Sequence, residues 1–152
     1  MPSTWDTRHI ISLTFGKKFK RNFEAGLVFK ASGGAPYTPI DSTTSSIRPV
    51  WDIYQSGLLD YNQLNNRRLD WFTNMDIRVS KKWYVKKFSL ELYLDIQNVY
   101  NFNADQPQNL TVERDAEGKP IVNPDNPAFY KTKFIPNPTG QILPSIGVVF
   151  GL

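Results

Sequence analysis

The sequence contains no cysteine and only one histidine, His9, among its 152 residues. Without cysteine, a disulfide framework and thiolate metal sites are excluded, and the compartment stays open. A lone histidine is a poor candidate for a general base or a metal ligand, because such work normally requires partner residues. We therefore expect His9 to lie at the end of a strand, as part of an aromatic girdle or at the edge of a loop. We expect no metal or cofactor.

Long apolar runs and a recognisable leader are also missing. No run of about 18 apolar residues occurs, so the sequence offers no transmembrane helix. Barrel strands alternate apolar and polar residues and keep the mean hydropathy low, so a membrane barrel stays possible. The residues after Met1 do not form a signal peptide. Accordingly, the chain is either cytosolic or part of a longer exported protein whose signal lies upstream.

The positive charge is local. A net charge of +4 suggests nucleic-acid binding as one function to consider. Eight of the 18 basic residues, however, fall in two clusters, and acids separate the others, so we expect no nucleic-acid partner. The clusters are Lys17, Lys18, Lys20 and Arg21, and Lys81, Lys82, Lys86 and Lys87.

Apolar and polar residues alternate in five stretches. The stretches lie near residues 8–16, 23–32, 74–80, 88–97 and 141–152. Such alternation predicts β-strands, because successive side chains of a strand point to opposite faces. A half-exposed sheet of a soluble protein would show the same pattern.

Three features favour a membrane barrel. The strands reach about 10 residues, which matches a tilted membrane crossing. Short connections, 17–22 and 82–87, alternate with irregular ones of roughly 35 to 40 residues that begin at Gly33 and Asn101, as in bacterial barrels. Aromatic residues gather at strand ends, as in the girdles of such barrels: Trp83 and Tyr84 at a short turn, and Trp71, Phe72, Tyr100 and Phe102 near the long loops.

The predicted fold is therefore all-β, an antiparallel up-and-down transmembrane barrel segment with about five long strands. A small hairpin is expected on the second long loop, with a turn at 115–120 between the runs 110–113 and 120–122. Short turns would face the periplasm, where the basic clusters either attract anionic lipid or are simply solvated.

The alternation assigns two faces. The residues expected to face lipid are Leu13, Phe15, Leu27, Phe29, Ile77, Leu90, Leu92, Leu94, Ile146, Val148 and Phe150. Those expected to face the lumen are Glu24, Lys30, Asp76, Arg78, Glu91 and Asp95. Opposite charges across neighbouring strands explain the second set better than catalysis, because no nucleophile or phosphate-binding loop accompanies the carboxylates. We therefore expect no enzymatic activity.

Ligand contact, if present, should come from the long loops. Trp51, Tyr54, Tyr61 and Arg67 or Arg68 offer stacking and hydrogen-bonding groups for planar or amphipathic cargo. Packing within the loops is the alternative for these residues.

Short motifs follow one another along nearly the whole chain. They read WDTRHII at 5–11, GGAPYTP at 33–39, RRLD at 67–70, NMDIRVSK at 74–81, LYLDIQNVYN at 92–101 and PSIGVVF at 144–150. In this order they resemble the last strands and loops of TonB-dependent outer-membrane receptors, in particular those of Bacteroidetes. The terminal residue departs from this pattern, since Leu152 stands where such barrels usually end in an aromatic residue, with Phe150 two positions earlier.

The resemblance implies that residues 1–152 form the C-terminal part of a receptor barrel that lacks its plug domain. Five strands cannot close a membrane barrel, for which about eight are needed. The implied partners are outer-membrane lipid, the missing N-terminal barrel and plug, and TonB. The implied function is energised import of a scarce nutrient such as an iron chelate, a cobalamin or a glycan. A passive porin or adhesin barrel and a soluble β-rich binding module remain as alternatives.

Overall fold

The computed structural model describes residues 3–151, so Leu152, which departs from the usual aromatic end of such barrels, lies outside the described residues. The chain is all-β with antiparallel sheets and divides into two compact units. We call Thr7–Gly34, Trp71–Ala104 and Thr139–Leu152 the sheet unit, and Met1–Asp6, Ala35–Asp70 and Asp105–Pro138 the loop unit.

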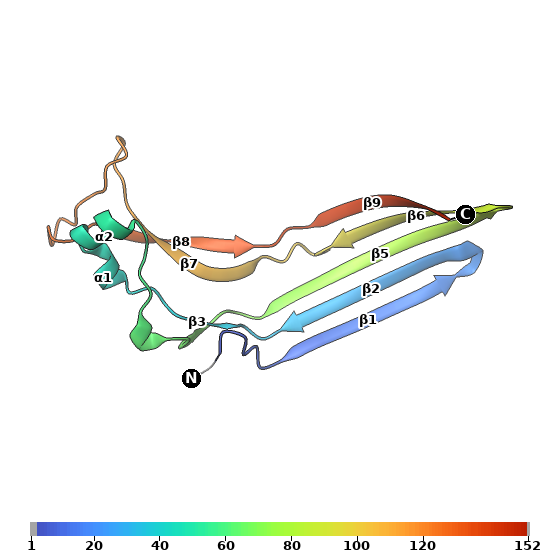
Figure 1. Ribbon diagram of the computed structural model, residues 1–152, viewed down its shortest axis with the longest axis horizontal. Coiled ribbons are helices and arrows are strands. Elements are labelled where there is room, and N and C mark those ends of the chain that lie inside the picture. Colours follow the sequence, from blue (N-terminus) through green and yellow to red (C-terminus); the bar gives the residue numbers. More distant parts are fainter. Residues whose placement is uncertain (1–2, 152) are drawn as a thin grey trace. The chain divides into compact units, whose positions relative to one another are not determined.

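The sheet unit is a single five-stranded antiparallel sheet (Figure 1). Its strands are β1 (Ile10–Phe19), β2 (Phe23–Ser32), β5 (Phe72–Val85), β6 (Phe88–Gln97) and β9 (Leu143–Gly151). They pair in the order β1-β2-β5-β6-β9, so each strand lies beside the next one of the sheet along the chain. All five predicted strands are present, and the described residues form an open sheet with β1 and β9 at its edges.

The short turns are tighter than the sequence predicted. β1 continues through Lys17 and Lys18, and only the 3₁₀ turn η1 (Lys20–Asn22) joins it to β2. β5 likewise continues through Lys81 and Lys82, which leaves two residues before β6. The prediction was wrong at these strand ends because it took each lysine cluster for a turn.

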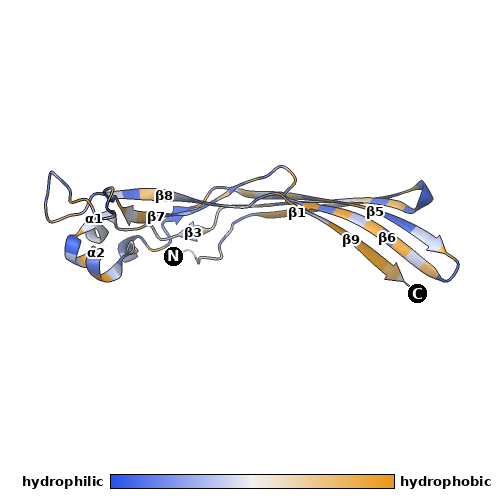
Figure 2. Ribbon diagram, turned by 90° about the horizontal axis from the view of Figure 1, so that it is seen from above, coloured by the Kyte–Doolittle hydropathy of each residue, from blue (hydrophilic) through white to orange (hydrophobic). Residues whose placement is uncertain are grey.

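The register gives the sheet two chemically different faces. Cα partners across the strands join Phe15 to Leu27 and Leu27 to Ile77, and further along they join Leu94 to Ile146. Residues paired in this way share a face, and each strand alternates between the faces. Hydrophobic positions recur along β6 and dominate β9 (Figure 2).

The long loops contain more regular structure than the sequence predicted. The first holds β3 (Pro36–Tyr37), α1 (Ser42–Ser46), α2 (Arg48–Tyr54), η2 (Tyr61–Gln63) and β4 (Arg67–Arg68). The second holds β7 (Ala104–Val112) and β8 (Thr132–Thr139), which pair with each other, while β3 pairs with β4. No helix in the described part of the chain is long and apolar enough to cross a membrane.

The predicted small hairpin is correct at its turn and incomplete at its base. Arg114 and Pro120 form an antiparallel bridge around the turn, where Gly118 has a φ of 81°. The run 110–113 does not pair mainly with 120–122, however, since Leu110 and Val112 belong to β7, whose partner is β8. The tip therefore continues a longer two-stranded sheet.

Candidate functional site

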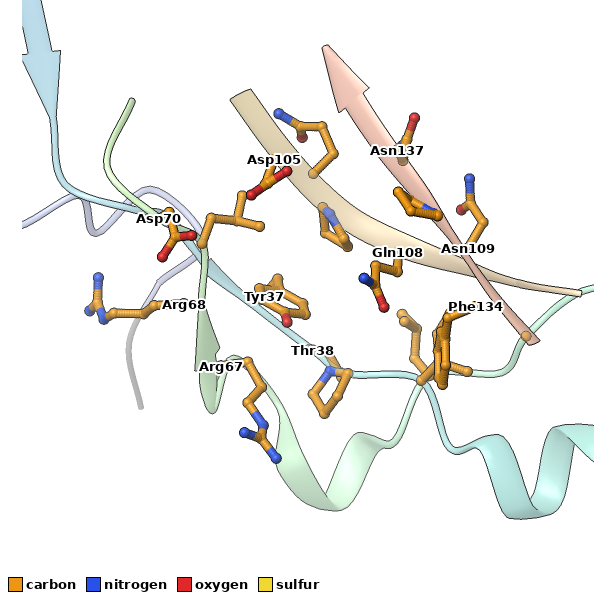
Figure 3. Close-up of a pocket in the computed structure, with 18 residues that line it drawn as sticks. Tyr37, Thr38, Arg67, Arg68, Asp70, Asp105, Gln108, Asn109, Phe134 and Asn137 are labelled. Atoms are coloured by element: carbon orange, nitrogen blue, oxygen red, sulfur yellow. The ribbon is translucent and has the colours of Figure 1, made fainter. Parts of the chain in front are cut away.

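The loop unit contains a pocket of about 670 Å³. Its lining comes from four parts of the unit, namely β3 with the residues after it, the segment between α2 and η2, β4 with the residues after it, and the β7–β8 pair. Figure 3 shows Tyr37 and Gln108 near the middle of this lining. The volume is in the range of small-molecule sites.

The lining is rich in hydrogen-bonding groups. It includes side-chain amides, two carboxylates, two arginines and two aromatic rings. These groups are Gln106, Gln108, Asn109 and Asn137, Asp70 and Asp105, Arg67 and Arg68, and Tyr37 and Phe134. Such a set can donate to and accept from a hydroxyl-rich ligand and stack on its apolar faces.

Of the four predicted ligand residues, only Arg67 lines this pocket. Tyr54 and Tyr61 are exposed outside the lining. Trp51 is 2% exposed and packs with Leu110 and Val112. Trp51 therefore packs within the loop unit, which was the alternative to ligand contact for this residue.

Arg68 also borders the pocket, but its guanidinium is held from another side. Its Nη2 donates to Asp6 Oδ2 at 2.6 Å and its Nη1 donates to the Asp6 carbonyl oxygen at 2.7 Å. In Figure 3 its side chain points away from β7 and β8. Two of the motifs noted in the sequence, around 5–11 and 67–70, therefore meet in one ion pair.

A capped turn positions one wall of the pocket. Asp41 caps α1 and accepts from the Thr44 amide at 3.0 Å and from the Thr44 hydroxyl. The hydrogen bond from the Thr44 side chain, followed by that from its backbone, lowers the pKa of Asp41 below its ordinary value. The buried Ser45 Oγ accepts from the Leu58 amide at 2.9 Å, and Ile40 bridges to Leu59. The cap thus fixes the segment that carries Pro39 and Ile40 along the lining.

The second candidate surface is the apolar face of the sheet unit. The register places all eleven residues expected to face lipid on this face. Phe15 is 62% exposed, Ile146 is 73% exposed and Phe150 is 72% exposed. Leu27, Phe29, Ile77 and Leu90 in the middle of the sheet are half-buried, and the other seven are exposed. The eleven side chains share one apolar face across five strands; contact with lipid itself stays a prediction.

The opposite face carries the six residues expected to face the lumen. Arg78 lies opposite Asp95 in the register, and its guanidinium is 4.0 Å from Glu91 and 4.1 Å from the ring centroid of Tyr93. Lys18 and Glu24 form an ion pair at 3.1 Å. The predicted charge ladder is therefore present for Glu24, Arg78, Glu91 and Asp95, whereas Asp76 accepts hydrogen bonds from Asn74 and Asn98 and Lys30 lies opposite Ser12 and Asn74 in the register.

Asparagines close the sheet end that leads into the long loops. Asn98 Nδ2 donates to the Phe102 carbonyl oxygen and the Phe102 amide donates to Asn98 Oδ1, both at 2.8 Å. The Asn98 amide donates to Asp76 Oδ1 at 3.0 Å, and the Ile142 amide donates to Asn101 Oδ1 at 2.9 Å. Both asparagines have positive φ, which this residue type tolerates. The end of the motif at 92–101 therefore closes β6 and ties the segment after it to the residues that lead into β9.

Aromatic rings gather at the same end of the sheet. His9 stacks on Trp71 with a centroid distance of 6.1 Å, and Phe102 contacts Phe72 and Tyr100 edge to face. Among residues 3–151, no group of three or more histidines, cysteines and acids is arranged to hold a metal ion.

No family model, no curated protein and no solved structure matches this chain.

Proposed function

We propose that the chain is the C-terminal barrel segment of a TonB-dependent outer-membrane receptor. The observation that carries the proposal is the apolar face shared in register by five long strands and left exposed to solvent. Large exposed apolar patches mark sites of contact with protein or membrane. Strands of 9 to 14 residues have the length of a tilted membrane crossing.

The two edges of the sheet support membership of a larger barrel. β1 and β9 each have one partner strand among the described residues. Backbone groups of an open edge in lipid would each cost several kcal/mol, so in a membrane both edges need neighbours. The proposed neighbours are strands of the receptor's N-terminal part, with β9 closing on its first strand.

The polar face then lines the lumen and the loop unit contributes to cargo capture. The proposal that TonB supplies the energy for import rests on the resemblance of the sequence motifs to those of TonB-dependent receptors. The polar pocket lined by Arg67, Asp70, Asp105 and several amides favours a hydroxyl-rich cargo such as a glycan over a cobalamin or an iron chelate.

Membrane insertion tests the barrel part of the proposal. The urea-unfolded chain is diluted into buffer or into phosphatidylcholine vesicles, and secondary structure, flotation and protease resistance are measured. We expect aggregation in buffer, and β-structure that floats with the vesicles, where the open edges of neighbouring chains can pair with one another in place of the missing strands. A stable soluble monomer in buffer would identify a soluble binding module and overturn the proposal.

Uptake tests the transport part. Cells that carry the complete reading frame, including the coding region upstream of Met1, are compared with cells in which residues 1–152 are deleted. Uptake of radiolabelled glycan fragments should require these residues and stop when the proton gradient is collapsed. Uptake that persists without the gradient indicates a passive pore instead.

A further inference from the structure

We infer that the turn end of the apolar sheet face binds anionic phospholipid headgroups through Lys17 and Lys81. The inference rests on the proposed function, since it assigns a specific lipid contact to the face proposed to lie in the membrane. The partner is the negatively charged phosphate of a lipid in the bilayer leaflet that meets the short turns.

Both lysines lie on the apolar face. Lys17 is the Cα partner of Ala25, which in turn pairs with Val79. Lys81 pairs with Phe23 on one side and with Leu92 on the other. Each ammonium group is thus set among side chains that would contact the hydrocarbon, near the end of the strands that leads to the short turns.

Aromatic rings flank both ammonium groups. Lys17 Nζ lies 5.4 Å from the ring centroid of Phe19, and Lys81 Nζ lies 5.7 Å from that of Trp83. Lysine stems cover apolar surface while their charged ends reach the polar layer, and tryptophan prefers that same layer. These pairs therefore have the composition of a surface at the depth of the headgroups.

The apolar face has no acidic residue among the described strand positions, so protein carboxylates do not balance these two charges there. The adjacent lysines on the polar face differ. Lys18 is paired with Glu24 at 3.1 Å, and Lys82 lies opposite Glu91 in the register. Lys17 and Lys81 are consequently available to an external anion, and the anion present at that depth of a membrane is the lipid phosphate.

The turns themselves raise the local positive potential. Lys20 and Arg21 lie in η1, and Lys86 and Lys87 join β5 to β6. Since β1 to β2 and β5 to β6 connect at the same end of an antiparallel sheet, these four charges belong to the end that carries Lys17 and Lys81. Anionic lipid is therefore favoured there over neutral lipid.

The test measures how the whole chain partitions onto two kinds of vesicle. One is phosphatidylcholine alone, and the other contains phosphatidylcholine and phosphatidylglycerol in equal parts. The variant Lys17→Gln/Lys81→Gln is compared with Lys18→Gln/Lys82→Gln, which removes the same charge from the same strands but from the opposite face.

We expect the native chain to prefer the anionic vesicles. The variant at positions 17 and 81 should lose about 30-fold of this preference, the factor that corresponds to about 1 kcal/mol per lysine. The variant at positions 18 and 82 should lose much less. Equal losses in the two variants would show that net charge alone matters and would overturn the inference.

The remaining outcomes separate the two proposals. Equal binding of the native chain to both vesicle types overturns this inference and leaves the membrane proposal standing. Absence of binding to either type overturns both. Inorganic phosphate, compared with chloride at the same ionic strength, should not displace the chain from the vesicles. Displacement by phosphate, or by a short duplex DNA at the same ionic strength, would identify a soluble anion or a nucleic acid as the partner and would overturn the inference.

Discussion

The two units differ in the solvent exposure of their large apolar side chains. In the loop unit, Trp51 and Val112 are each 2% exposed and form a small core. In the sheet unit, Phe15 and Phe150 are 62% and 72% exposed, and the strands are joined edge to edge in a single layer. A sheet normally buries its apolar face against a second layer. The loop unit thus buries apolar side chains within itself, whereas the sheet leaves apolar side chains exposed along one face.

Removal of the core of the loop unit should have the largest effect on stability, and this effect should be confined to that unit. Trp51→Ala should destabilise this unit by about 3–5 kcal/mol, because a large buried side chain is lost. The buried Trp51 Nε1 has no hydrogen-bond partner in the described structure, so the loss is one of packing. Hydrogen exchange of peptides from α2 and β7 should accelerate, while exchange of β6 peptides stays unchanged.

Tyr54→Ala is the matched control for this change. Tyr54 lies on the same helix and is 58% exposed, so its removal should alter exchange within about 0.5 kcal/mol. Equal acceleration in the two variants would contradict the small core.

A charge placed on either face of β1 sharpens the contrast within the sheet. Leu13→Lys should destabilise the membrane-inserted protein by about 2–4 kcal/mol if it lies near the bilayer midplane. Thr14→Lys changes the neighbouring position on the polar face and should have little effect. Urea titration of the vesicle-bound protein measures both, and similar losses would argue against a lipid-facing surface.

The sheet end near the long loops depends on polar contacts. Asn98→Ala removes two side-chain hydrogen bonds, each worth about 0.5–1.5 kcal/mol, and places alanine at a φ of 51°. Asn98→Gly loses the same hydrogen bonds but accepts this φ. We expect fast exchange of the Phe102 amide in both variants and a larger loss of stability for alanine. Unchanged exchange would mean that the side chain of Asn98 does not hold this turn.

The smallest effect concerns the cap of α1. Asp41→Ala should cost about 0.5–2 kcal/mol of local stability, whereas Asp41→Asn keeps a capping oxygen. Because folding lowers the pKa of Asp41, its ionised form stabilises the native state, fully above the ordinary carboxyl pKa. This contribution is lost as the pH falls through the folded pKa. Proteolysis of the first long loop at acidic pH should therefore increase in the native chain more than in Asp41→Asn.

The structure within the long loops could not be predicted because it depends on prolines in strands and on contacts between distant segments. β7 contains Pro107 and β8 contains Pro136 and Pro138, which lack the N–H that a strand ladder uses. The sequences of β7 and β8 therefore lack the regular alternation of apolar and polar residues that predicts a strand. The core joins Trp51 to Leu110 across about 60 residues, and the pocket is lined by several segments far apart in the sequence, so a local pattern predicts neither.

Alternation of apolar and polar residues was sufficient to predict the five strands and the division of their side chains between two faces. That was possible because alternation is a local property, set by successive residues that point to opposite sides of one strand. The folded chain was needed to show that Trp51 is a core residue, that Arg67 joins the amides of β7 in a pocket, and that Lys17 and Lys81 share the apolar face. Those outcomes depend on register and on contacts between distant segments, where a shift of one residue would move each side chain to the other face.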